Sequence, residues 1–170
     1  MGRSVFAAAL LAFFILQPGC GAPSEEARVM EVVRKAAVLA ERGDLDAMME
    51  LLTPGYYDFR DRDKDATRAL VEDYLTSFRG VVIHVLGAKA EITEPGARAA
   101  VTADLVLSSG AAEAFRKLVR FTGDYFRFDL ELEKFPGAQW RIAYADWRSI
   151  SLSDLFPESL EILKELFPGL

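Results

Sequence analysis

The spacing of apolar side chains changes near residue 80, and this change constrains the fold more than any other feature of the sequence. Before residue 80, apolar residues recur at every third or fourth position, as on one face of a helix. After it they recur at every second position, as on one face of a strand. Helices followed by strands predict an α+β domain in which the helices gather on one face of an antiparallel sheet.

Three helices are predicted before the change. Ser24, followed by two glutamates, begins the first helix, because serine accepts a hydrogen bond from a free N–H group and carboxylates suit the helix dipole. Gly43 ends this helix and Asp44 caps a second one, which stops at residues 53 to 55. A third helix is expected from about residue 65 to 78.

The strands are predicted at residues 81–90, 97–107, 115–134 and 140–150. In the first strand one face is expected to carry Val82, His84, Leu86, Ala88 and Ala90. In the third strand, apolar and charged residues alternate from 126 to 133, which indicates one buried and one wet face. We therefore expect a curved antiparallel sheet of four or more strands. A C-terminal amphipathic segment, residues 151–170, is expected to pack on the domain; the alternative is contact with a partner or a membrane.

The N-terminus has the layout of an export signal. Arg3 precedes an unbroken apolar run of 12 residues, and Pro18 and Gly19 interrupt the pattern just before Cys20. As a helix the run would cover about 18 Å, at about 1.5 Å per residue, whereas the bilayer core is about 30 Å thick. We therefore expect a signal peptide at residues 1–19 and a tether at 20–27.

Cys20 is the only cysteine, so it has no disulfide partner within the chain. Its surroundings resemble the lipobox of bacterial lipoproteins, in which a small residue precedes a lipidated cysteine. Gly19 fits, Leu16 stands one place further back than usual, and Gln17 and Pro18 depart from the pattern. The resemblance implies an acyl anchor on Cys20 and a location in the bacterial cell envelope, facing the periplasm or the exterior. The alternatives are ordinary cleavage near Gly21 and an incidental thiol.

The formal net charge of −6 argues against nucleic acid as a partner and against electrostatic docking on anionic lipids. The chain has one histidine and one cysteine, which excludes a histidine-rich or cysteine-rich metal site. No cofactor is expected.

Two segments resemble the nuclear transport factor 2-like superfamily. "LAERGDLDAMMELLTPGYYDF" is similar to its first two helices and the following turn, and "GAQWRIAYADW" is similar to its final strand. The resemblance covers roughly residues 28–150. It implies a curved sheet that wraps around helices to form a cone with an apolar pocket at its mouth. Members include ketosteroid isomerase, scytalone dehydratase, polyketide cyclases and many proteins without catalysis.

Two residues are candidates for a catalytic base. His84 is either a base in the pocket or, as we favour, a partly buried histidine bonded to a neighbour. Asp146, on the strand face expected to hold Trp140, Ile142 and Tyr144, either lies in an apolar cup or, as we favour, faces outward and pairs with Arg148, Arg127 or Arg120.

The resemblance to ketosteroid isomerase does not extend to its base. Asp58 and Asp61 fall close to where isomerase-like members place their catalytic aspartate, but Arg60, Arg62 and Lys64 are interleaved with them. A carboxylate that abstracts a proton needs an apolar setting that raises its pKa. This sequence instead predicts ionised carboxylates on a solvated loop.

Our leading interpretation is a membrane-tethered, non-catalytic extracytoplasmic domain that binds a small apolar ligand or a protein partner. The alternatives are an isomerase-type or cyclase-type enzyme that uses His84 or Asp146, and a periplasmic lipid carrier. The residues expected to line the pocket are Tyr56, Tyr57, His84, Phe126, Phe128 and Tyr144.

Overall fold

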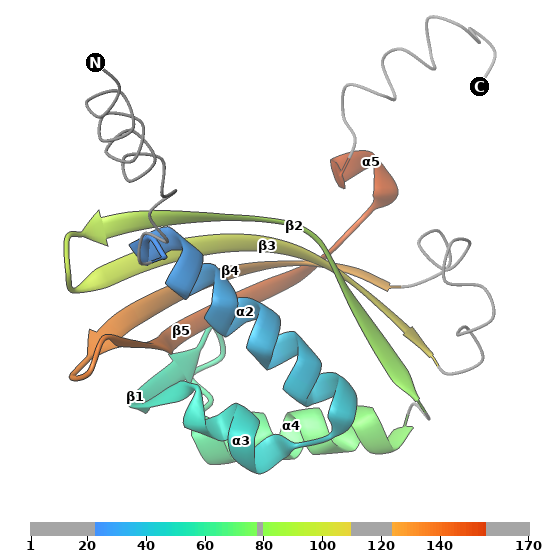
Figure 1. Ribbon diagram of the computed structural model, residues 1–170. Coiled ribbons are helices and arrows are strands. Elements are labelled where there is room, and N and C mark those ends of the chain that lie inside the picture. The colour runs from blue at the N-terminus through green and yellow to red at the C-terminus, as the bar shows by residue number, and fades with distance from the viewer. Residues whose placement is uncertain (1–22, 78–79, 110–123, 156–170) are drawn as a thin grey trace, which may run out of the picture.

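The computed structural model describes residues 23–77, 80–109 and 124–155 (Figure 1). Its elements are α2 (Glu25–Arg42), α3 (Leu45–Glu50), β1 (Leu52–Asp58), α4 (Lys64–Ser77), β2 (Val81–Glu94), β3 (Arg98–Ser109), β4 (Asp124–Phe135), β5 (Gln139–Ile150) and α5 (Leu152–Leu155). The predicted signal peptide, Cys20, residues 115–123 of the predicted third strand and residues 156–170 lie outside the described residues.

The first two helices begin, and the first helix ends, where the sequence predicts, whereas α3 ends at Glu50, before the predicted stop at residues 53 to 55. The Ser24 side chain accepts a hydrogen bond from the Ala27 backbone N–H at 3.2 Å, and that of Asp44 accepts one from Ala47 at 3.2 Å. Gly43 ends α2 with φ at +69°, a left-handed conformation that glycine adopts without steric cost. The Asp63 side chain accepts from Ala66 N at 2.9 Å at the start of α4.

Five strands form a curved, open sheet in the order β1-β5-β4-β3-β2 (Figure 1). Strands β2 to β5 are antiparallel neighbours, as expected, but β1 runs parallel to β5, so the sheet is mixed. The sequence did not predict β1, because Thr53, Pro54 and Gly55 resemble a helix stop. An edge strand tolerates a proline, since the missing N–H need not face a neighbour.

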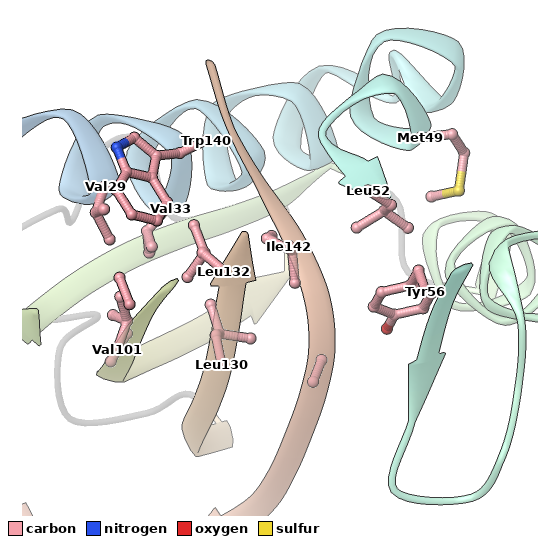
Figure 2. Packing of buried hydrophobic residues seen from close by; sticks show 13 residues of the cluster. Val29, Val33, Met49, Leu52, Tyr56, Val101, Leu130, Leu132, Trp140 and Ile142 are labelled. Atoms are coloured by element: carbon pink, nitrogen blue, oxygen red, sulfur yellow. The ribbon is translucent and has the colours of Figure 1, made fainter. Parts of the chain in front are cut away.

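The sheet face that contacts α2, here called the inner face, holds the hydrophobic core. Val29 and Val33 of α2 point toward Val101 and Leu132 of the sheet (Figure 2), and Leu132 is fully buried. Burial of each such side chain stabilises the fold by about 1.5–3 kcal/mol. The opposite, outer face carries ion pairs between neighbouring strands: Asp104 with Arg127 at 2.7 Å and Asp129 with Arg148 at 3.0 Å. The prediction for β4 is thereby confirmed: Leu130 and Leu132 lie on the buried face, and Arg127 and Asp129 lie on the polar face.

Glu25, in the first turn of α2, attaches this helix to the end of the sheet where β4 turns into β5. Its Oε1 accepts from Lys134 Nζ and its Oε2 from the Trp140 indole Nε1, each at 2.9 Å. These bonds join α2 to β4 and β5. Residues 25–27, which were predicted to be part of the tether, thus belong to the helix.

Two of the bulges in the described sheet change which of the predicted site residues share a face. In β2, Val85 pairs with Leu105 and Gly87 with Asp104, so Leu86 is an extra residue. An extra residue reverses the alternation of a strand. Ala88 therefore faces inward while His84 faces outward, and the prediction that these two residues share a face was wrong.

The second bulge lies in β5, where Glu131 pairs with Tyr144 but Leu132 pairs with Ile142. The extra residue is Ala143. Ile142 faces the core, whereas Tyr144 and Asp146 lie on the outer face. The prediction that Asp146 shares a face with Ile142 was therefore wrong, for the same physical reason.

Candidate ligand-binding site

Four aromatic side chains form a continuous row on the inner face, here called the aromatic row: Phe126, Phe128, Trp147 and Phe59. Phe128 and Trp147 are register partners on β4 and β5, and their rings are nearly parallel, with centroids 5.8 Å apart. The rings of Phe59 and Trp147 pack edge to face, with their centroids 4.9 Å apart. Phe59 is 38% exposed and the other three are half-buried, so the row offers apolar surface to a ligand.

Phe59 belongs to a loop that closes on Asp58, the last residue of β1. Asp58 is almost completely buried. Its Oδ1 accepts from the backbone N–H groups of Arg60 at 2.8 Å and Arg62 at 3.0 Å, and its Oδ2 accepts from Arg62 Nε at 2.6 Å. The Asp58 N–H in turn donates to the Arg62 carbonyl at 3.1 Å, and Asp61 takes a left-handed φ of +58°. The loop is thus folded around one carboxylate.

These contacts decide the protonation state of Asp58. Burial would raise the pKa of this carboxyl, but the backbone and side-chain hydrogen bonds from Arg62, and then the bond from Arg60, hold the pKa below its ordinary value. Asp58 is therefore ionised, as expected, but the expectation that it lies on a solvated loop was wrong. Because its oxygens already accept three N–H donors, it is poorly suited to act as a general base.

Two guanidinium groups lie at the Phe59 end of the row. The guanidinium carbon of Arg60 is 5.3 Å from the Phe59 ring centroid, and that of Arg62 is 5.1 Å from the Trp147 centroid. Arginine over an aromatic face makes a favourable cation–π contact. In the part of the chain that the structure describes, no carboxylate pairs with Arg60, and Arg62 binds a carboxylate through Nε alone.

Tyr56 lies on the inner face but belongs to the core, with 4% exposure. Burial raises its pKa, and the nearby charge of Asp58 adds to this effect. The phenol is therefore neutral at physiological pH, and it packs with Met49 and Leu52 at the end of the core that lies toward α3 (Figure 2).

The other predicted pocket residues lie on the outer face. Tyr57 is 51% exposed and its ring contacts Tyr144 at 5.1 Å. The pKa of Tyr144 is raised, chiefly by desolvation and then by the charge of Asp146. His84 pairs in register with Val106, and its Nε2 is buried without a hydrogen-bond partner among the described residues.

The six predicted pocket residues therefore do not form one site. The structure brings Phe126 and Phe128 together in the aromatic row and places Tyr56 in the core of the same face. Tyr57 and Tyr144 meet on the other face. His84 on β2 and Asp146 on β5 are separated by β3 and β4, so they do not form a pair of interacting groups.

Sequence reasoning missed four residues of the candidate site: Phe59, Arg60, Arg62 and Trp147. The two arginines were considered only as neighbours that neutralise the acids. Trp147 was overlooked because a regular β5 would place it on the face opposite Trp140, whereas the bulge at Ala143 puts both on the inner face. The signal that was available is the Phe-Arg-Asp-Arg stretch at residues 59–62, in which two arginines follow an aromatic residue closely.

The described ranges 23–77, 80–109 and 124–155 contain no group of three or more histidine, cysteine or acidic residues that could hold a metal ion. In the same ranges no helix is long and apolar enough to cross a membrane.

Comparison with known proteins identifies the fold. No family model matches the sequence, and no curated protein matches it. Solved structures do match. An NTF2-like protein with a cystatin-like fold from Novosphingobium aromaticivorans is 19% identical, with 91% of this chain and 95% of that chain covered and a TM-score of 0.57. A protein of the same organism, provisionally named scytalone dehydratase, is 14% identical, with 73% and 83% covered and a TM-score of 0.59.

A third match, Bd1075 of Bdellovibrio bacteriovorus, is 10% identical with a TM-score of 0.58. The aligned region is 73% of this chain but only 40% of the length of that protein. The class of protein is thus an α+β domain with helices on one face of an open, curved sheet. Its fold is nuclear transport factor 2-like, as the sequence resemblance implied.

Proposed function

We propose that this domain binds a small apolar ligand on the aromatic row without catalysing a reaction on it. The observation that carries the proposal is the partial exposure of four contacting aromatic rings on the inner face. Binding sites for small molecules are lined mainly by apolar and aromatic side chains, with a few polar groups that fix orientation. The row has this composition.

At the Phe59 end of the row, the described residues include no group well suited to act as a general base, and this favours binding over catalysis. Enzymes of the isomerase or dehydratase type need a titratable group and a donor that converge on the substrate. Of the described groups at the Phe59 end of the row, Asp58 is occupied by three donors and Arg60 and Arg62 are permanent cations. His84 and Asp146 lie on the other face of the sheet. The neighbour named as a dehydratase supports the enzyme alternative through its fold alone.

The chain offers a direct test because it has two tryptophans with different environments. Trp140 is 4% exposed in the core, whereas Trp147 belongs to the row. We expect 2-naphthamide, a neutral flat probe, to shift the Trp147 indole signal in ¹H–¹⁵N NMR spectra saturably and to leave the Trp140 signal nearly unchanged. Trp147→Phe assigns the two signals.

Phe128→Ala is expected to weaken this binding, because it removes the ring stacked on Trp147. Phe135→Ala is the matched control, since Phe135 lies on the same strand but on the outer face, paired with Gln139. Equal affinities of the two variants, or the absence of any Trp147 shift in the wild type, would contradict the proposal.

We also propose that the domain is held at a membrane by an acyl chain on Cys20. The support is the lipobox resemblance at Gly19 and Cys20 and the start of α2 at Glu25, which leaves a short tether between them. One acyl chain anchors marginally and two or more anchor stably. In a bacterial host, Cys20→Ser is expected to move the protein out of the membrane fraction and to remove the acyl mass. Unchanged fractionation of the variant would contradict the anchor.

A further inference from the structure

We propose that the ligand of the aromatic row carries an anionic oxygen group, and that Arg60 and Arg62 bind this group. The inference rests on the proposed function, because it assigns the charge of a ligand whose apolar body lies on the row. It concerns the end of the row at Phe59, where both guanidinium groups lie over aromatic rings.

Arg62 is held in place by its partners. Its Nε donates to the buried Asp58 at 2.6 Å, and its guanidinium lies over Trp147 and Phe59, at 5.1 and 5.7 Å from the ring centroids. An arginine has five N–H donors in a planar fork. The bond to Asp58 uses one of them, and the donors on the two terminal nitrogens have no hydrogen-bond partner among the described residues. A fixed cation with free donors is suited to a carboxylate, sulfonate or phosphate.

Arg60 adds a second cation without a competing acid. Its backbone N–H is bound to Asp58, which fixes the position of the residue in the loop, and its guanidinium is 5.3 Å from the Phe59 centroid. No ion pair of Arg60 is present in the described part of the chain. Phe59 therefore lies beneath two guanidinium groups, and an anion at this end of the row would be within reach of both.

The acidic residues of the loop do not cancel this arrangement. Asp58 and Arg62 form a net neutral pair, so Arg62 offers its free N–H donors while Arg60 supplies the unpaired positive charge. The Asp63 carboxylate accepts the Ala66 N–H at the start of α4. Asp61 is the remaining acid between the two arginines, and it is exposed. The net charge of −6 supplies no long-range attraction for an anion. We therefore expect recognition through direct contact, with the apolar body of the ligand supplying the rest of the affinity.

A cationic ligand is the opposite possibility, because aromatic faces also attract cations. In this structure the faces at the Phe59 end already carry guanidinium groups at 5.1 to 5.7 Å. A ligand ammonium group placed there would meet two like charges. The arrangement thus favours an anion over a neutral group, and a neutral group over a cation.

The experiment compares three probes of similar shape and different charge: 2-naphthoate, 2-naphthamide and 2-naphthylmethylammonium. Dissociation constants are measured on the full domain from the Trp147 indole shift. We expect the naphthoate to bind about fivefold more tightly than the naphthamide, the size of effect that a partly exposed ion pair gives, and the ammonium probe to bind most weakly.

Arg60→Gln is expected to reduce the ratio of naphthoate affinity to naphthamide affinity to less than about twofold, and this ratio is the quantity compared between the variants. Arg141→Gln is the matched control, because Arg141 also lies over a phenylalanine, at 5.1 Å from the Phe135 centroid, but on the outer face. Arg62→Lys keeps a cation beside Asp58 and is expected to retain part of the preference.

The outcomes separate the two proposals. Equal binding of naphthoate and naphthamide, or a preference that Arg60→Gln leaves intact, would overturn the anionic ligand and leave apolar binding standing. Tighter binding of the ammonium probe than of naphthoate would also overturn the anionic ligand and leave apolar binding standing. If no probe shifts the Trp147 signal, the proposed function fails and the anionic ligand fails with it.

Discussion

The carboxylate of Asp58 accepts the Nε–H of Arg62 at 2.6 Å, and the Asp58 side chain has no exposed surface. This ion pair fixes the loop that carries Phe59 and Arg60 to the aromatic row. An aspartate close to where isomerase-like members place a base is here occupied by three N–H donors, from Arg60 and Arg62. It holds Phe59, Arg60 and Arg62 in position.

Replacing Asp58 by asparagine is expected to lower the free energy of unfolding by about 2 kcal/mol, because the charge-assisted bond to Arg62 is lost and the arginine remains beside a neutral group. Urea unfolding at pH 7 measures the change. Asp61→Asn, in the same loop but exposed, is expected to change stability by less than about 0.5 kcal/mol. Similar losses in the two variants would show that Asp58 has no special structural role.

The same pair predicts a pH dependence. The pKa of Asp58 is lowered in the folded protein, so its ionised form stabilises the fold fully above the unfolded value of about 3.9, and this stabilisation is lost as the pH falls through the folded pKa. The stability difference between wild type and Asp58→Asn is therefore expected to be constant from pH 7 to about 5 and to shrink at lower pH.

Urea unfolding of both proteins at several pH values between 7 and 2.5 checks this dependence. Glu25 and Asp154 also have lowered pKa values, chiefly through side-chain hydrogen bonds, from Lys134 and Ser151 respectively. They are present in both proteins, so their contribution cancels in the difference. A difference that stays constant down to pH 2.5 would contradict the assignment of the shift to Asp58.

Local patterns were sufficient to predict most of the fold. Ser24, Gly43 and Asp44 define helix ends through single side chains or one backbone conformation. The alternation in β4 identified its buried face because that strand is regular throughout its pairing with β3. Such signals depend only on neighbours in the chain.

Features that depend on distant partners were not predictable. Strand β1 forms only because β5 offers a parallel edge, where Ile142 N donates to the Leu51 carbonyl at 2.8 Å. The bulge at Leu86 is marked only by the adjacent Gly87, and the one at Ala143 has no such mark, yet each reverses the faces of the residues around it. The sequence therefore placed Phe128 correctly on the inner face and His84 wrongly.

Leu132→Ala tests the position of the core. Leu132 is fully buried between α2 and the sheet, so its truncation leaves a cavity that the surrounding strands cannot fill. The expected loss of stability is about 3 kcal/mol. Leu70→Ala on α4, where the leucine is 38% exposed, is expected to cost less than about 1 kcal/mol. Urea unfolding of the two variants measures both, and equal losses would contradict the assignment of the core to the inner face.

His84→Ala and Asp146→Asn test the separation of the two sheet faces. Both residues lie on the outer face, and the aromatic row lies on the inner face. The affinity of wild type for 2-naphthamide, measured from the Trp147 indole shift, is therefore expected to stay within about twofold in each variant, because a substitution without contact to the ligand changes binding little. Phe128→Ala in the same series is expected to weaken binding by more than about fivefold, since an aromatic pair and its buried area are lost. Weaker binding after His84→Ala, with the far-UV circular dichroism unchanged, would place the histidine at the site and would restore the catalytic alternative.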